Sequence, residues 1–164
     1  MIYLYTQYPN GGKIEIHHLV DISASDFSNV FACCDYFAKQ GKNTLITPRF
    51  GETIGNPEYE IIYASLKSTP YWGKCPDFCV DGHWYEYESF DLNKDLSNLH
   101  RRADTFSLVM KRGLKQSDRI ILEDCGVSHS YVMRNIFNRV HFENQNISKV
   151  YFRTSSGLQL LYKK

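Results

Sequence analysis

The stretch that decides the fold is Cys75-Pro76-Asp77-Phe78-Cys79-Val80-Asp81-Gly82-His83-Trp84-Tyr85-Glu86-Tyr87-Glu88. Two short runs rich in apolar residues flank Asp81-Gly82, and Asp-Gly in that setting is a strong sequence signal for a two-residue hairpin turn. Such a turn sets the register, so we expect Val80 opposite His83 and Asp77 opposite Glu86. Because side chains alternate along a strand, one face of the hairpin should carry Cys75, Asp77, Cys79, Trp84, Glu86 and Glu88.

Three carboxylates belong to that face: those of Asp77, Glu86 and Glu88. Like charges directly opposite each other destabilise a strand pair, so we expect a cation between Asp77 and Glu86. A divalent metal is the simplest candidate, because Mg²⁺ and Mn²⁺ take carboxylate and carbonyl oxygens. The backbone carbonyl of Tyr87 is then a further candidate ligand. The alternative is an edge hairpin whose acids point into water.

The composition is that of a folded protein, and it restricts the class. A chain of 164 residues with 43% hydrophobic residues predicts one domain over 1–164. No apolar run reaches the length of a membrane span, and the N-terminus lacks the pattern of a signal peptide. Five cysteines without framework spacing indicate a reducing compartment, so a cytoplasmic protein is expected.

Charge is distributed unevenly along the chain. Residues 1–97 hold 7 Lys and Arg against 13 Asp and Glu, a net charge of −6, whereas residues 98–164 hold 12 against 5, a net charge of +7. An acidic half that holds a cation beside a basic half that holds phosphates suits a metal-dependent enzyme acting on a polyanion. Ordinary surface charge that interleaves after folding explains the asymmetry equally well.

The rest of the sequence predicts an alternation of strands and helices. Periodicity, caps and turn residues predict an N-terminal hairpin within 1–22 (strands 2–8 and 13–20), a helix from Ser25 to Gly41, a strand at 43–47, a helix from Asn56-Pro57, a helix over 96–112 stopped by Gly113, a strand at 119–123, a helix from Ser128 or Ser130 to Phe142, and a last hairpin of 149–153 and 158–162. This order favours an α/β (α+β) fold with a mixed central sheet flanked by helices.

The hairpin also resembles a known family. Pro76-Asp77, followed nine residues on by Glu86-Tyr87-Glu88, resembles the motif of the PD-(D/E)XK nuclease superfamily. Its surroundings are more similar to the C-terminal tRNA nuclease domains of CdiA-type contact-dependent inhibition toxins, with a helix ending in Lys39-Gln40-Gly41 before the hairpin and Ser-Asp-Arg-Ile-Ile-Leu at 117–122 after it. The resemblance covers residues 24–162 and implies a restriction-endonuclease-like core.

The resemblance implies an activity and assigns residues to it. The activity is metal-dependent hydrolysis of RNA or DNA, with Asp77 and Glu86 as metal carboxylates and Mg²⁺ or Mn²⁺ as cofactor. Glu60 is a weaker candidate for an additional acid, and Glu58 competes with it. The lysine of the family falls at Glu88, where a glutamate would instead serve as a general base or bind a second metal.

Partners and setting follow from the same resemblance. It implies nucleic acid as substrate and an immunity or accessory protein as a partner, whereas nothing indicates a membrane. CdiA-type toxin domains stand at the end of very long proteins, so a chain that begins at Met1 favours an independent role, for example on a mobile element.

Basic residues of the second half are the candidate contacts to phosphate. They are Arg101, Arg102, Lys111, Arg112, Arg134 and Arg139. In a nuclease these side chains would hold the nucleic-acid backbone, and otherwise they are ordinary solvated faces. Two other functions stay open: a nuclease-like nucleic-acid-binding module that has lost catalysis, which Glu88 favours, and a protein-interaction domain built on the same scaffold.

Overall fold

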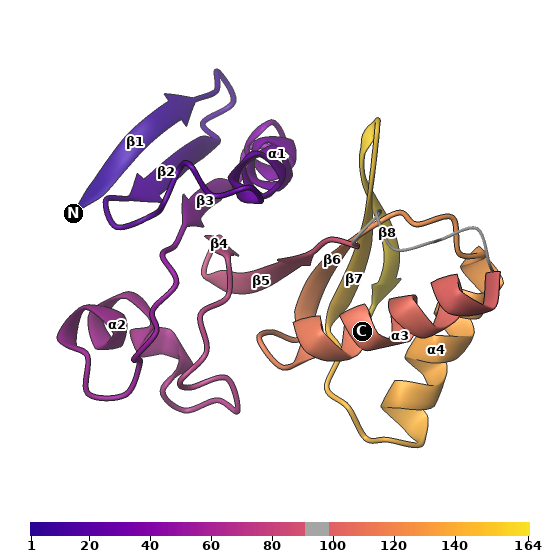
Figure 1. Ribbon diagram of the computed structural model, residues 1–164. Coiled ribbons are helices and arrows are strands. Elements are labelled where there is room, and N and C mark those ends of the chain that lie inside the picture. The colour runs from indigo at the N-terminus through magenta and orange to yellow at the C-terminus, as the bar shows by residue number, and fades with distance from the viewer. Residues whose placement is uncertain (91–98) are drawn as a thin grey trace. The chain divides into compact units, whose positions relative to one another are not determined.

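The structure is a computed structural model that describes residues 1–90 and 99–164, with only the backbone described for 99–104. These residues confirm the mixed fold class: eight strands, each hydrogen-bonded to the next in chain order, and four α-helices (Figure 1). They group into two compact units, Met1–Tyr85 and Glu86–Lys164, whose boundary falls within strand β5 (His83–Glu88). A single domain over 1–164 stays a prediction.

The first unit contains the predicted N-terminal hairpin. Strand β1 (Ile2–Gln7) pairs antiparallel with β2 (Lys13–His17), and β2 pairs parallel with β3 (Asn43–Ile46). Strand β3 pairs antiparallel with β4 (Phe78–Val80), which continues into the hairpin with β5.

Over Phe78–Val80 the β4–β5 hairpin has the register that its turn predicts, whereas Asp77 opposite Glu86 lies beyond the paired residues and stays a prediction. Val80 lies opposite His83, and Phe78 lies opposite Tyr85. Both turn residues have a positive φ, 46° at Asp81 and 83° at Gly82, which suits a short polar residue followed by glycine. The Asp81 carboxylate accepts a hydrogen bond from the backbone N–H of Asn43 at 2.9 Å and lies 3.1 Å from Lys42 Nζ, so it ties the turn to β3.

Helix α1 (Phe27–Ala38) buries one face in the first unit, through Val30, Cys33, Cys34, Phe37 and Ala38. The predicted cap at Ser25 is wrong, because the residue before the helix is Asp26. Asp26 makes no side-chain cap; its carboxylate pairs with Arg49 instead. Phe37 lies 5.3 Å from Tyr85 between ring centroids, which joins the helix to the hairpin.

A second helix starts at the predicted Asn-Pro pair. The side chain of Asn56 accepts hydrogen bonds from the backbone of Glu58 and Tyr59, and helix α2 (Pro57–Ile62) follows, with a short 3₁₀ turn η1 (Ala64–Leu66). These two elements carry a small aromatic core formed by Tyr59, Tyr63, Leu66, Phe50, Tyr71, Trp72 and Trp84. Trp72 and Trp84 are partly buried and pack against this core.

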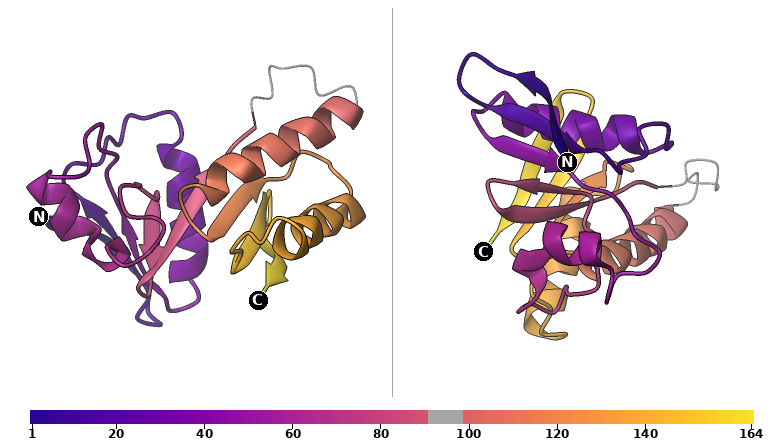
Figure 2. Two further views of the ribbon diagram at one scale, coloured as in Figure 1. Left: turned by 90° about the horizontal axis from the view of Figure 1, so that it is seen from below. Right: turned by 90° about the vertical axis from the view of Figure 1, so that its left-hand side faces the viewer.

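The second unit begins in β5 and has parallel strands at its centre. The last residues of β5 pair parallel with β6 (Arg119–Glu123), β6 pairs parallel with β7 (Lys149–Thr154), and β7 forms the predicted hairpin with β8 (Gly157–Lys163). Helices α3 (Leu99–Leu114) and α4 (His129–His141) pack beside these strands (Figure 2). The shared core includes Phe106, Met110, Ile120, Leu122, Val132, Ile136, Val150 and Phe152.

The sequence predicts that Gly113 ends the third helix, but this prediction is wrong. Helix α3 runs on to Leu114, and a Cβ at Gly113 would lie 3.1 Å from Glu88 Cγ and 3.2 Å from Ile120 Cγ2. Glycine at this position therefore allows a close approach of α3 to the side chains of Glu88 and Ile120. The expected start at Leu96 lies outside the described residues.

The start of helix α4 decides between its two predicted caps. Helix α4 begins at Ser128, whose Oγ accepts a hydrogen bond from the Tyr131 N–H, so the first of the two predicted caps is the one used.

In the described part of the chain, helices long and apolar enough to cross a bilayer are absent. All five cysteines are free thiols.

Candidate functional site

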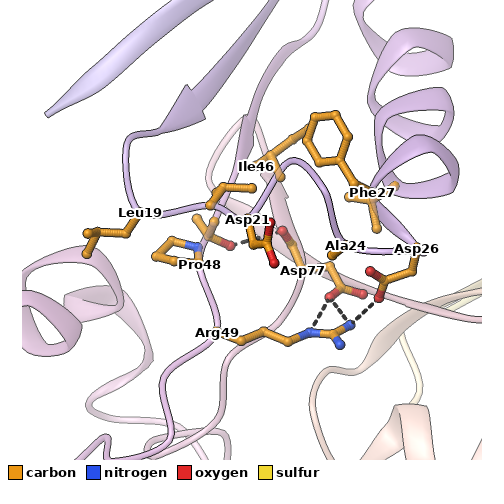
Figure 3. Close-up of a pocket in the computed structure, with 12 residues that line it drawn as sticks. Leu19, Asp21, Ala24, Asp26, Phe27, Ile46, Pro48, Arg49 and Asp77 are labelled. Carbon is orange, nitrogen blue, oxygen red and sulfur yellow. Dashed lines mark hydrogen bonds and ion pairs between the residues drawn. The ribbon is translucent and has the colours of Figure 1, made fainter.

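Asp77 lies just before β4, and its carboxylate is held by an arginine. The residue is 5% exposed, and Arg49 donates to Oδ1 from Nε at 3.2 Å and from Nη2 at 2.7 Å. Arg49 Nη2 also lies 3.0 Å from Oδ2 of Asp26, so one guanidinium joins two carboxylates (Figure 3). The Thr47 N–H donates to the Asp77 carbonyl at 3.0 Å and fixes the backbone there.

This ion-paired group opens on a pocket of the first unit. The pocket measures about 270 Å³, and its polar side chains include Asp21, Asp26, Arg49 and Asp77. Its apolar lining includes Phe27 and Val30 of α1 and Ile46 of β3, and Figure 3 shows Phe27 and Ile46 beside the carboxylates. The pocket therefore offers carboxylate oxygens of Asp21, Asp26 and Asp77. The Asp77 carboxylate, however, already accepts hydrogen bonds from the guanidinium of Arg49.

Glu86 and Glu88 lie on the part of β5 that belongs to the second unit. In the parallel ladder with β6 they stand opposite Ile120 and Leu122, and they are only 6% and 7% exposed. Two buried carboxylates two residues apart are uncommon, because removing charge from water is costly unless the charge is paired or holds a metal.

Arg112 supplies the opposite charge to Glu88. Its Nε donates to Glu88 Oε2 at 2.7 Å and its Nη2 lies 2.5 Å from the same oxygen. The hydrogen bond to Glu88 raises the pKa of Arg112, and the nearby charge of Glu86 acts in the same direction. The Arg112 side chain is 60% exposed, so a solvent-accessible guanidinium is anchored on a buried carboxylate.

Tyr87, between the two acids, uses its side chain elsewhere. Its hydroxyl donates to Glu123 Oε1 at 2.5 Å, and Arg153 pairs with the same oxygen. Its backbone stands opposite Ile121 in the ladder. The Tyr87 carbonyl as a metal ligand stays a prediction.

The two weaker acidic candidates belong to the first unit. Glu60 Oε1 accepts a hydrogen bond from the Gly55 N–H at 3.1 Å, so this carboxylate stabilises the loop before α2. Glu58 is exposed at the start of the same helix. In the structure, neither carboxylate lies in the pocket beside Asp77.

The predicted basic residues divide into exposed and buried ones. Lys111, Arg112 and Arg134 are exposed, whereas Arg139 is 5% exposed and donates to Asn135 Oδ1 and to the Ser107 carbonyl, both at 2.8 Å. Burial lowers the pKa of Arg139, whose hydrogen bonds join α4 to α3 in the interior. The side chains of Arg101 and Arg102 lie outside the described part of the chain.

The structure thus gathers the candidate residues into two groups. Glu86, Glu88 and Arg112 lie together in the second unit, and Asp77 lies with Arg49 in the first. Within the described part of either unit, no three His, Cys, Asp or Glu side chains converge on a common metal position. The sequence does not predict Arg49 as a member of this group, because its contact with Asp77 joins residues 28 positions apart.

The comparisons with known proteins add little. No family model matches the chain, and no curated protein does. Among solved structures the chain is similar to the CdiA-CT/CdiI toxin and immunity complex from Burkholderia pseudomallei, with 14% identity over 90% of this chain and 92% of that chain and a TM-score of 0.48. At that identity and TM-score the likeness assigns neither a family nor an activity to this chain.

Proposed function

We propose that this chain is a metal-dependent nuclease that hydrolyses the phosphodiester backbone of RNA, with tRNA as the first candidate, or of DNA. One observation carries the proposal: Glu86 and Glu88 are buried carboxylates two residues apart on β5, and the exposed guanidinium of Arg112 is fixed beside them. Carboxylates suit a hard cation and a guanidinium suits a phosphate, so a single place in the unit offers both kinds of contact.

Glu86 is the residue that we assign to hold Mg²⁺ or Mn²⁺, and Asp77 as a metal carboxylate stays a prediction from the sequence. The donor chemistry fits, because both ions prefer carboxylate oxygens and Glu86 presents its carboxylate from a strand rather than from a loop. Such an ion, when bound, polarises a phosphoryl oxygen and lowers the pKa of a bound water.

Arg112 is assigned to bind a phosphate oxygen of the substrate. Its contact with Glu88 uses Nε and Nη2 and leaves Nη1 for a ligand. Glu88 is then a positioning residue, because its ion pair orients the guanidinium and reduces the rotamer freedom that phosphate binding would otherwise have to restrict. This role differs from that of the general base which the sequence suggested for Glu88.

The outer face of α4 supports a nucleic-acid substrate as well. Arg134 and Phe137 are exposed there, and the Phe137 ring lies 4.3 Å from that of His141 between centroids. No carboxylate occurs between His129 and His141. The exposed Phe137 ring can stack on a base, and the Arg134 guanidinium can hold a phosphate, with no carboxylate on the helix to repel it.

Cleavage assays test the proposal. Purified protein is incubated with tRNA, single-stranded DNA and duplex DNA, in Mg²⁺, in Mn²⁺ and in EDTA, next to the Glu86→Ala and Asp77→Ala variants. We expect cleavage in metal only and its loss in Glu86→Ala. Cleavage that survives in both variants overturns the assignment of the carboxylates.

A second candidate function is a nucleic-acid-binding module without turnover. The observation that favours it is that Asp77 and Glu88 are both bonded to arginines, which leaves their carboxylates less suited to binding a metal. It predicts salt-sensitive binding of nucleic acid and no cleavage in any metal. Robust turnover by the wild-type protein would reject it. An immunity or accessory protein partner stays an expectation.

A further inference from the structure

Helix α4 and strand β8 together line a second pocket, which belongs wholly to the second unit. The pocket measures about 410 Å³. Met133, Ile136 and Val140 of α4 give it an apolar lining, and Tyr162 lines it from β8. A volume of this size, with an apolar lining and a few polar groups, is typical of a site that takes a small ligand or one group of a larger ligand.

Aromatic rings stand at this pocket as well. Phe137 and His141 line it from α4, opposite the contribution of Tyr162 from β8. The Phe137 side chain is 53% exposed, and its ring centroid lies 4.3 Å from that of His141 and 6.0 Å from that of Phe142. The neighbouring rings hold Phe137 in place on the helix surface. A planar group that stacks on it therefore meets a ring that is already ordered.

Two polar groups at the pocket have no partner in the described part of the chain. The guanidinium of Arg134 makes no ion pair or hydrogen bond there, and neither does the hydroxyl of Tyr162. Arg139 on the same helix is different, because it is buried and donates to Asn135 and Ser107. The Arg134 guanidinium is thus hydrated, and it can exchange water for the oxygens of a phosphate or carboxylate.

Positive charge extends from the pocket along the last hairpin. Residues 144–164 contain three lysines and one arginine and no Asp or Glu. Lys149 of β7 stands directly opposite Lys163 of β8, and Lys164 follows. Like charges in that position destabilise a strand pair, so an anion bound near them stabilises the hairpin. Glu143, the acid that follows α4, is paired with Arg139. The region therefore suits a ligand with several negative charges.

We propose that this pocket binds an unpaired nucleotide of a single-stranded nucleic acid, with the base on the Phe137 ring and a phosphate on Arg134. A nucleotide combines the planar ring and the anion that the pocket can bind, and the phosphates that follow it along the strand match the lysines. An apolar side chain of an acidic protein matches the pocket less well, because it gains no stacking on Phe137. In a duplex the bases are stacked inside the helix and do not reach such a pocket.

This inference rests on the proposed function, because it narrows the substrate of the nuclease to nucleic acid with unpaired nucleotides. It uses different residues, however. Glu86, Glu88 and Arg112 carry the proposed chemistry, whereas the pocket is formed by side chains of α4 and β8. Binding at the pocket and cleavage can therefore be measured separately.

The test measures binding in EDTA, by fluorescence anisotropy. A labelled RNA strand and the DNA strand of the same sequence are each used alone and annealed to the complement. The variants are Phe137→Leu, which removes the ring and keeps an apolar side chain, Phe137→Tyr, which keeps a ring, and Arg134→Gln. Phe142→Leu is the matched control, because Phe142 is 75% exposed next to Phe137 and is not part of the pocket lining in the described structure.

The effect should be specific to single strands. We expect Phe137→Leu and Arg134→Gln to bind the single strand about tenfold more weakly than the wild type, since each loses one stacking or phosphate contact. Phe137→Tyr and Phe142→Leu should bind it like the wild type. Binding of the duplex should change by less than about twofold in Phe137→Leu, because a duplex offers no unpaired base to the ring.

Three results overturn the inference: a wild-type protein that binds neither single strand, a Phe137→Leu variant that binds single strands as tightly as the wild type, or an equal loss of single-strand and duplex binding in that variant. Circular dichroism checks that the variants are folded. If Phe137→Leu is not, a strand that carries a photoreactive thio-base decides, because it must crosslink the wild-type protein at the peptide that contains Phe137; crosslinks that are confined to other peptides reject the pocket.

Failure of the nuclease activity gives a different result. If the wild type leaves every nucleic acid intact in Mg²⁺ and in Mn²⁺ while Phe137→Leu still weakens single-strand binding, the pocket stands and the nuclease does not. If Phe137→Leu both binds and cleaves single strands like the wild type, the nuclease stands and the pocket does not.

Discussion

The guanidinium of Arg112 is anchored on the carboxylate of Glu88, with Nε 2.7 Å from Oε2. The carboxylate is buried on β5 and the guanidinium is largely exposed at the end of α3. The pair therefore presents a fixed cation to solvent beside the buried Glu86, whose charge acts on Arg112 in turn. A fixed cation next to a carboxylate is the arrangement on which the proposed nuclease activity depends.

Removal of this cation should weaken nucleic-acid binding. For Arg112→Gln we expect roughly tenfold weaker binding in EDTA, and a salt dependence whose slope falls by about 1, because one phosphate contact is lost. Fluorescence anisotropy with a labelled oligonucleotide measures both. Lys115→Gln is the control, because Lys115 is exposed in the segment after α3. An equal loss in the two variants would contradict a specific role for Arg112.

The ion pair should also contribute to stability. We expect Arg112→Gln to lower the free energy of unfolding by about 1–2 kcal/mol, because it leaves a buried carboxylate without its ion pair, with the value reduced by the exposure of the arginine. Glu88→Gln with Arg112→Gln should cost less than the sum of the single changes. Urea unfolding of the four proteins measures the coupling, and strict additivity would show that the pair contributes nothing.

Gly113→Ala tests the close approach of α3 to the strands. Alanine favours a helix by up to about 1 kcal/mol over glycine, but its Cβ would lie 3.1 Å from Glu88 Cγ. We expect a net loss of about 1–3 kcal/mol in thermal or urea unfolding, because the packed side chains of Glu88 and Ile120 have to move. A stabilised Gly113→Ala variant would mean that the contact relaxes freely and that the glycine is not needed.

The turn of the central hairpin should make stability depend on pH. The hydrogen bond from Asn43 N–H lowers the pKa of Asp81, and Lys42 contributes in the same direction. A lowered folded-state pKa gives stability that is present above the unfolded-state pKa and is lost as pH falls through the folded-state pKa. The side chain is 37% exposed, so we expect less than about 1 kcal/mol.

Asp81→Asn isolates this contribution. Asparagine tolerates the positive φ and still accepts a hydrogen bond from Asn43, so the change removes the charge and keeps the turn. Melting temperatures of wild type and variant should differ at neutral pH and converge in acid. A difference that stays constant with pH would assign the effect to the turn rather than to the charge.

Local signals in the sequence predicted much of the fold. Asp81-Gly82 fixed the hairpin register, and Asn56-Pro57 marked the start of α2, because both depend only on neighbouring residues. Gly113 was misread as a helix stop because its function depends on Ile120, a contact that exists only after folding.

The candidate site was harder to predict for the same reason. Arg139 and Arg134 look alike in the sequence, yet one is buried between helices and the other is exposed. The pairing of Glu88 with Arg112, and of Asp77 with Arg49, joins residues 24 and 28 positions apart. No periodicity or turn signal connects such residues, so the sequence predicted the carboxylates, and Arg112 as a phosphate contact, but neither of the two ion pairs.

The most direct test of the central claim is calorimetric titration of Mn²⁺ into the wild-type protein and into Glu86→Gln, which keeps the size of the side chain and removes its charge. Glu52→Gln, at an exposed acid that has no place in the predicted site, is the control. We expect the wild type and Glu52→Gln to bind Mn²⁺ alike and Glu86→Gln to bind at least about tenfold more weakly, a loss of about 1.4 kcal/mol. Equal affinity in Glu86→Gln and wild type, or no binding by the wild type, would contradict the metal site.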